Sequence, residues 1–226
     1  MARRGPRPYA GRMSDAPRHH KPVKFSPEQF EAHEGGPDPA RVSEAAHLAA
    51  HALVSRGRAS DDPEISRRLI ELTDEQGLEG IAEMWAEAPA VSLPGALWRL
   101  YALRAGVRKD PVRMGRYFTA GRGTAQVSHV VAGVAEPPGA DEITSMADAI
   151  LSGAFNGEFD VALDRFAAFC RVIALGRIRL ADTGQMPVVD PDAARAPSTV
   201  ALTQRLERTA EELEAAAHQW RRGHLD

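Results

Sequence analysis

The chain is poor in cysteine, in lysine and in long apolar runs. Its 226 residues include one cysteine, Cys170, which has no second cysteine to pair with in an internal disulfide. No apolar run approaches the roughly 20 residues that span a bilayer, and the N-terminus lacks the apolar stretch typical of a secretory signal. We therefore expect a cytoplasmic protein that makes no membrane contact.

Aromatic residues are also few, at 6%, whereas hydrophobic residues make up 43% and charged residues 26%. These proportions are typical of a soluble globular protein. The formal net charge of −3 argues against a protein that coats nucleic acid with its whole surface. Any contact with a polyanion should therefore be local.

Aspartate-proline pairs stand before stretches with helical apolar spacing. They are Asp38-Pro39, Asp62-Pro63 and Asp110-Pro111; a fourth, Asp190-Pro191, lies in an aperiodic stretch. Aspartate accepts from the free N–H groups of a first helical turn, and proline suits the first helical position. The pattern predicts an all-α fold, a compact bundle of five to seven helices.

Several individual helices can be placed from this periodicity. Thr73 and Gln76 have the spacing of a capping box and predict that a separate helix begins there, although Gly77 and Gly80 disfavour it. The helix containing Ile143–Leu151 and the one beginning at Phe159 are joined by Asn156-Gly157 and predict an antiparallel hairpin. Residues 120–139 leave helix and strand both open. The first helix is expected over residues 39–56, with a core-facing side made of Val42, Ala45, Ala46, Ala49 and Leu53.

Four segments are predicted: a disordered basic arm and bridge (1–37), a helical core (38–181), a linker (182–197) and a C-terminal amphipathic helix (198–226). The arm carries a net charge of +6 over residues 1–24 and is interrupted by prolines, which favours disorder. Arginine-rich arms bind phosphate, so nucleic acid or an acidic protein is the expected partner, with a solvating tail as the alternative. The cations are Arg3, Arg4, Arg7, Arg12, Arg18, Lys21 and Lys24.

The C-terminal helix has an apolar seam. Leu206, Leu213 and Trp220 recur every seven residues, and Leu202, Thr209 and Ala216 form a second, interleaved series with the same spacing. The seam predicts either self-association or docking of a protein partner, or folding back onto the chain's own core. The preceding linker favours contact with another chain.

A metal site is the main alternative to a protein that needs no cofactor. Glu44, His47 and His51 share one face of the first helix, in the spacing that helical carboxylate–histidine proteins use for a divalent metal. A further ligand would come from another helix, and His129, Glu75 and Asp148 are the candidates. The competing interpretation is a solvated helix face.

Other catalytic patterns are weaker. HEPN-class ribonucleases place a histidine shortly after an arginine, and both Arg122/His129 and Arg41/His47 meet that spacing. Cys170 lies in an apolar stripe and is expected in the core rather than as a nucleophile. No functional role is expected for two further groups. Asp160 and Asp164 are expected to be solvated, and Trp85, Trp98 and Tyr101 are expected to lie in the core.

Two segments, residues 97–111 (LWRLYALRAGVRKDP) and 135–176, resemble a family of small all-helical proteins from high-GC Gram-positive bacteria. The family has no assigned activity, and some of its members carry an RNA-polymerase-subunit label. The resemblance implies an all-helical fold and a link to transcription, and it supplies no site residues. Together these patterns predict a non-enzymatic interaction or regulatory protein.

Overall fold

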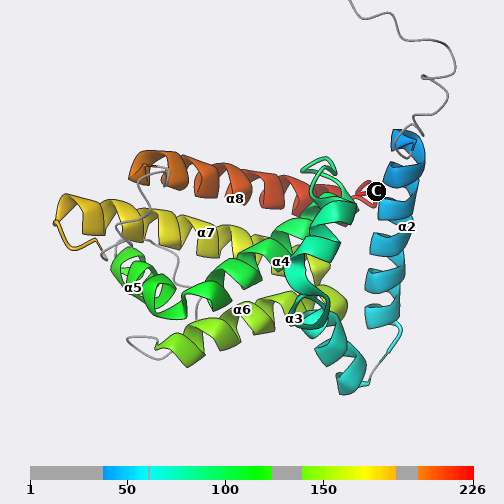
Figure 1. The fold of residues 1–226 in the computed structure, drawn as a ribbon, viewed down its shortest axis with the longest axis horizontal. Coiled ribbons are helices and arrows are strands. Elements are labelled where there is room, and N and C mark those ends of the chain that lie inside the picture. Colours follow the sequence, from blue (N-terminus) through cyan, green and yellow to red (C-terminus); the bar gives the residue numbers. More distant parts are fainter. Residues whose placement is uncertain (1–37, 61, 124–138, 187–197) are drawn as a thin grey trace, which may run out of the picture. The chain divides into compact units, whose positions relative to one another are not determined.

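The computed structural model describes residues 38–60, 62–123, 139–186 and 198–226, without the side chains of residues 63, 73 and 75–77. Throughout these ranges the only regular secondary structure is helical, and together the ranges form one compact unit. The predicted basic arm and most of residues 120–139 lie outside the described residues. The helices, shown in Figure 1, are α2 (Pro39–Arg58), α3 (Pro63–Trp85), α4 (Leu93–Lys109), α5 (Pro111–Arg122), α6 (Ala140–Phe155), α7 (Phe159–Asp182) and α8 (Thr199–Arg221).

The Asp-Pro pairs begin helices as predicted. The carboxylate of Asp38 accepts from the Ala40 amide at 3.0 Å, and that of Asp62 accepts from the Glu64 amide at 2.9 Å. Asp110 caps α5 in the same way. Each cap satisfies an amide that has no partner inside its helix, so these three starts are encoded locally.

The prediction that a new helix begins at Thr73 is wrong. Helix α3 runs without a break from Pro63 to Trp85, through both Gly77 and Gly80. Tertiary contacts hold it at both ends of the doubtful stretch. The Tyr101 hydroxyl donates to the Leu69 carbonyl at 2.5 Å, and the Trp85 indole donates to the Ala46 carbonyl at 3.1 Å. Packing on α2 and α4 therefore outweighs the low helix propensity of the glycines.

Helix α7 is the central element of the core. It packs against α5, α6 and α8, and α8 runs antiparallel to it along most of its length (Figure 1). The predicted hairpin of α6 and α7 is confirmed, and Gly157 turns the chain with a φ of 93°. Phe166 and Cys170 lie fully buried on α7, as expected for a core stripe.

The core-facing side of α2 is predicted only in part, because Ala46 is buried and Ala49 and Leu53 pack against the core, but two other predicted residues do not. Val42 is 40% exposed and Ala45 is also exposed, whereas Ala50 and Val54 are buried. In an alanine-rich helix many faces carry similar apolar area, so periodicity alone does not decide which one packs. The buried face is instead fixed by neighbours such as Phe155, whose Cβ lies 2.7 Å from where a Cβ on Gly57 would stand.

Candidate partner-binding groove

Helix α8 is divided between core and surface. Leu213 is fully buried in the core that includes α7, as are Ala210 and Ala217. Leu206 and Leu202, about two and three turns nearer the start of α8, are only half-buried. The seam predicted to contact another chain therefore packs in its C-terminal part within its own chain, while its N-terminal part retains exposed apolar surface.

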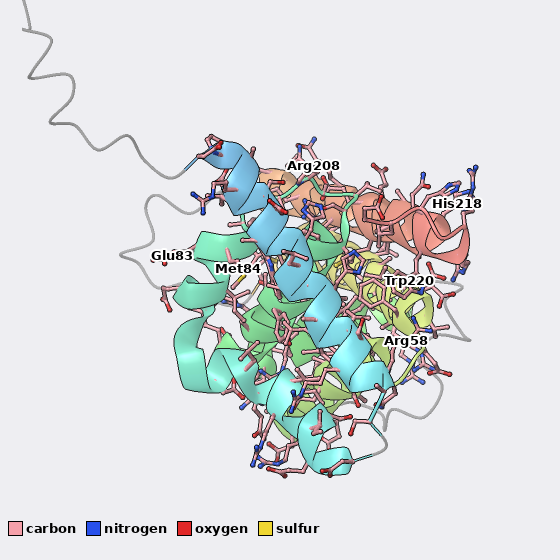
Figure 2. All side chains as sticks on the ribbon, turned by 90° about the vertical axis from the view of Figure 1, so that its right-hand side faces the viewer. Arg58, Glu83, Met84, Arg208, His218 and Trp220 are labelled. Atoms are coloured by element: carbon pink, nitrogen blue, oxygen red, sulfur yellow. The ribbon has the colours of Figure 1, made fainter. Side chains whose placement is uncertain are left out.

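The end of α8 is anchored to two other helices. The ring of Trp220 lies 4.7 Å from that of Phe159 on α7, centroid to centroid. The guanidinium of Arg58, at the end of α2, lies 5.6 Å from the Trp220 ring, and Figure 2 shows the two side chains close together. These contacts fix the last turns of α8. The first turns of the helix, which carry the half-buried Leu202 and Leu206, are less covered.

The start of α4 is joined to the segment that follows α8. The Leu93 amide donates to the Asp226 carbonyl at 2.7 Å, and Leu225 is buried. A second link, from Arg99 Nε to Glu212 Oε2, also measures 2.7 Å. From this junction α4 and α8 diverge towards α5, over α7 (Figure 1). Beyond these links lies a groove lined by later residues of α4 and the first turns of α8, and we call the end where the links join its two walls the closed end.

A cavity of about 300 Å³ lies in this α4/α8 groove. Its volume is at the lower end of the range found for ligand pockets and suits one or two large side chains. The walls are mainly hydrocarbon, and half-buried residues of α4, α5 and α8 surround a floor provided by α7. The residues that matter most are Leu103, Val107, Met114, Ile173, Leu202 and Leu206.

Two arginines bring positive charge to the groove. Arg177 projects from α7, and Arg205 is exposed on α8. The guanidinium of Arg177 lies over the ring of Tyr117, 4.9 Å from its centroid, which fixes its plane. The Nε of Arg177 is buried and has no hydrogen-bond partner. Among the described lining residues there is no carboxylate to neutralise either arginine.

A larger cavity, about 510 Å³, lies between α2, α3 and α6, but its polar groups contact one another. The Ser66 hydroxyl donates to the Asn156 side-chain oxygen at 3.2 Å. Arg67 is held by Glu64 and Glu71 on its own helix. Because these groups already have partners, this cavity indicates a ligand less clearly than the α4/α8 groove does.

The candidate metal ligands lie on α2. Glu44 and His51 are exposed and His47 is half-buried, with its Nδ1 2.8 Å from the Ser43 carbonyl. Two suggested further ligands, His129 and the side chain of Glu75, fall outside what the structure describes. In the described ranges no three histidine, cysteine or acidic side chains gather in a way that could hold a metal.

The third suggested ligand, Asp148, belongs to an ionic network centred on the buried Arg104. Arg104 is 1% exposed, and its Nε donates to Asp148 Oδ1 at 2.6 Å. Its two terminal nitrogens donate to the carboxylate of Asp74, at 3.0 and 2.9 Å, and Arg108 completes the group. The hydrogen bonds from Arg104 lower the pKa of Asp74 below its ordinary value.

Sequence reasoning missed this network, although a signal was present. Arg104 occupies a helical position in line with Leu97, Leu100, Tyr101 and Val107, all of which are buried. A cation at such a position is expected to require acidic partners from neighbouring helices. The network joins α3, α4 and α6, so its evident role is to hold the core together.

The remaining catalytic candidates are also placed, as far as the described residues extend. Arg122 lies at the end of α5, but His129 is undescribed, and Arg41 and His47 lie on α2. Asp160 and Asp164 are not simply solvated, because both accept from Arg221 of α8. Burial raises the pKa of the Cys170 thiol to about 12, as expected for a core residue rather than a nucleophile.

None of the described helices has the length and apolar character needed to cross a bilayer. Comparison with known proteins gave no match to a family model, a curated protein or a solved structure. The resemblance of residues 97–111 and 135–176 to a helical family therefore stays a prediction. The α4/α8 groove is the feature of the described chain that best indicates a function.

Proposed function

We propose that this chain is a non-enzymatic interaction protein whose α4/α8 groove receives apolar side chains of a protein partner. The observation that carries the proposal is the incomplete burial of Leu202 and Leu206 beside an apolar cavity. Fully burying an exposed leucine side chain contributes about 1.5–3 kcal/mol, and because Leu202 and Leu206 are already half-buried, covering the rest of each contributes roughly half of that. Protein interfaces commonly depend on a few side chains of this kind held in well-packed pockets.

The groove offers binding surface rather than reactive groups. Its described lining supplies hydrocarbon, the hydroxyl of Thr209 and the cations Arg177 and Arg205. Since Arg99–Glu212 and Leu93–Asp226 fix its closed end, the walls are positioned before any partner arrives. Preorganised walls reduce the entropy that is lost when a partner binds.

The basic arm supports a second contact within the same function. Seven cations within residues 1–24 favour attachment to a polyanion, and arginine contacts phosphate through two parallel hydrogen bonds. The chain would then link a protein held in the groove to nucleic acid held by the arm. This role agrees with the connection to transcription that the family resemblance implies.

The test is capture of a partner by groove variants of the full chain. We expect the wild-type protein to retain a partner that Leu206→Glu loses, because the longer charged side chain removes apolar contact area and fills space that the partner's side chains would enter. Val200→Glu is the matched control, since Val200 lies on the same helix, is 66% exposed and does not line the cavity. A partner retained equally by both variants would show that the groove is not the contact.

A further inference from the structure

The two arginines of the groove give it a chemical preference that apolar area alone does not. Arg177 and Arg205 come from different helices, α7 and α8, and both line the same cavity. We infer that the groove selects an amphipathic helix of a partner protein in which an acidic residue lies beside the apolar ones. This inference rests on the proposed function, because it names the chemistry of the segment that the groove receives.

Arg177 is held ready to bind an anion. The Tyr117 ring supports one face of its guanidinium, and Tyr117 itself is 1% exposed, so the plane of the guanidinium is defined by a rigid neighbour. Its Nε is buried with no acceptor. Buried donors in folded proteins nearly always have a partner, and an exception requires an explanation. Because the Nε itself is covered, a carboxylate entering the groove would meet the part of the Arg177 side chain that stays accessible.

Arg205 adds charge from the α8 wall. Two acidic residues farther along the same helix are already engaged elsewhere: Glu212 with Arg99 and Glu214 with Arg171. No described lining residue carries a negative charge, so the two cations leave a local charge of +2 in the described lining. Complementary charge at an interface selects among partners and speeds their association.

The shape of the site favours a helix over an extended strand. The groove lies between two helices that diverge from a closed end, and its cavity of about 300 Å³ admits two leucine-sized side chains. Apolar residues four apart on one helix face would fill such a cavity, which is the usual mode of helix-in-groove recognition. An acidic residue at one edge of that face would then meet the arginines.

The experiment is a selection from a displayed library of amphipathic helical peptides of about 15 residues, randomised along one face. The bait is the full chain. Peptides that also bind the Leu206→Glu variant are discarded, so that the peptides kept are those that need an intact groove. We expect enrichment of leucine-like residues together with aspartate or glutamate. Changing the selected acid to its amide should weaken binding about tenfold.

Variants of the arginines assign this preference to the groove. With Arg205→Gln, and with Arg177→Gln/Arg205→Gln, the affinity for the acidic peptide divided by the affinity for its amide counterpart should fall to about one. Arg165→Gln, which removes an exposed arginine of α7 outside the lining, should leave the ratio unchanged. Circular dichroism and a melting curve confirm that each variant is folded, and Arg205→Gln carries the test if the double variant is not.

The outcomes separate the two proposals. Apolar enrichment with no acid preference would overturn the inference and leave the proposed function standing. Absence of apolar enrichment would overturn both. Asp190→Asn/Asp192→Asn tests another occupant, because these acids lie in residues 187–197, outside the described ranges and just before α8. An acidic peptide bound tenfold more tightly by that variant would identify the chain's own segment as the ligand and overturn the inference.

Discussion

Gly121 of α5 and Gly176 of α7 lie so close together that neither position has room for a side chain. A Cβ on Gly176 would stand 1.8 Å from the Tyr117 carbonyl oxygen, and one on Gly121 would stand 1.9 Å from the Val172 carbonyl oxygen. The two helices therefore pack backbone to backbone. Because the backbone of Tyr117 takes part in this contact, the two glycines also determine where the Tyr117 ring lies relative to the guanidinium of Arg177.

We predict that Gly176→Ala destabilises the protein by about 3 kcal/mol, because a methyl group directed at a helix backbone cannot be accommodated by side-chain motion. Urea unfolding followed by circular dichroism measures the change. The same substitution should weaken binding in the groove, since separating α5 from α7 displaces both Tyr117 and Met114.

Gly80→Ala is the matched control, and it should have the opposite effect. Gly80 lies within α3, is exposed, and would place its Cβ with no heavy atom of the surroundings within 4 Å. Removing the flexibility of a mid-helix glycine should stabilise the protein by about 1 kcal/mol. If both glycine variants shift the midpoint in the same direction, the close α5–α7 contact is not the cause.

The buried guanidinium of Arg104 predicts a large loss on truncation. Arg104→Met leaves the carboxylates of Asp74 and Asp148 without their main partner, and because both stay about a third exposed to solvent we expect a loss of about 2 kcal/mol in the free energy of unfolding. Arg108→Met removes a 40% exposed member of the same group and should cost less than about 1 kcal/mol. Equal losses measured by urea unfolding would mean that burial does not control the contribution of the network.

The lowered pKa of Asp74 predicts an acid-sensitive contribution to stability. A carboxyl group whose pKa is lower in the folded state stabilises that state at pH values above the ordinary pKa, which is 3.8 here. The stabilisation is lost as the pH falls through the pKa of the folded state. The wild type should therefore lose more stability than Asp74→Asn between about pH 5 and pH 2. Parallel pH profiles of the two unfolding midpoints would contradict this assignment.

Truncations along α8 should separate stability from recognition. Leu213→Ala creates a cavity in the core and should cost about 3 kcal/mol, whereas Leu206→Ala should cost about 1 kcal/mol or less and still impair partner capture. A chain ending at Ala196 lacks α8 altogether, so it should lose cooperative unfolding as well as any assembly. A shortened chain that melts as cooperatively as the wild type would show that α8 is not part of the core.

The basic arm gives an independent prediction. Deleting residues 1–24 removes a net charge of +6, and retention on DNA or RNA at low salt should fall sharply. The wild-type protein should lose its retention as the salt concentration rises. Retention that is unchanged by the deletion would assign nucleic-acid contact to another part of the chain.

The helical starts were predictable from sequence because their causes are local. Asp38, Asp62 and Asp110 each accept from an amide within three residues, and such contacts need no knowledge of the rest of the fold. The capping-box spacing of Thr73 and Gln76 misled the prediction, because what holds α3 as one helix is the packing of Trp85 and Tyr101 on other elements.

The groove could not be predicted from sequence in the same way. The heptad spacing of Leu206 and Leu213 correctly indicated one apolar seam, but the two residues have different fates because α4 diverges from α8 between them. Spacing within one helix contains no information about that divergence. The partnerless Nε of Arg177 was equally hidden, since it depends on the position of Tyr117, sixty residues earlier in the chain.

The division of α8 has a consequence for how this protein could diversify. Its later turns are held in the core by Leu213 and Trp220, so substitutions there would destabilise the fold and be selected against. Its opening turns, around Leu202 and Arg205, are free to change size and charge while the rest of the molecule stays intact. Relatives with the same scaffold could therefore acquire different binding partners through a few substitutions at one end of a single helix.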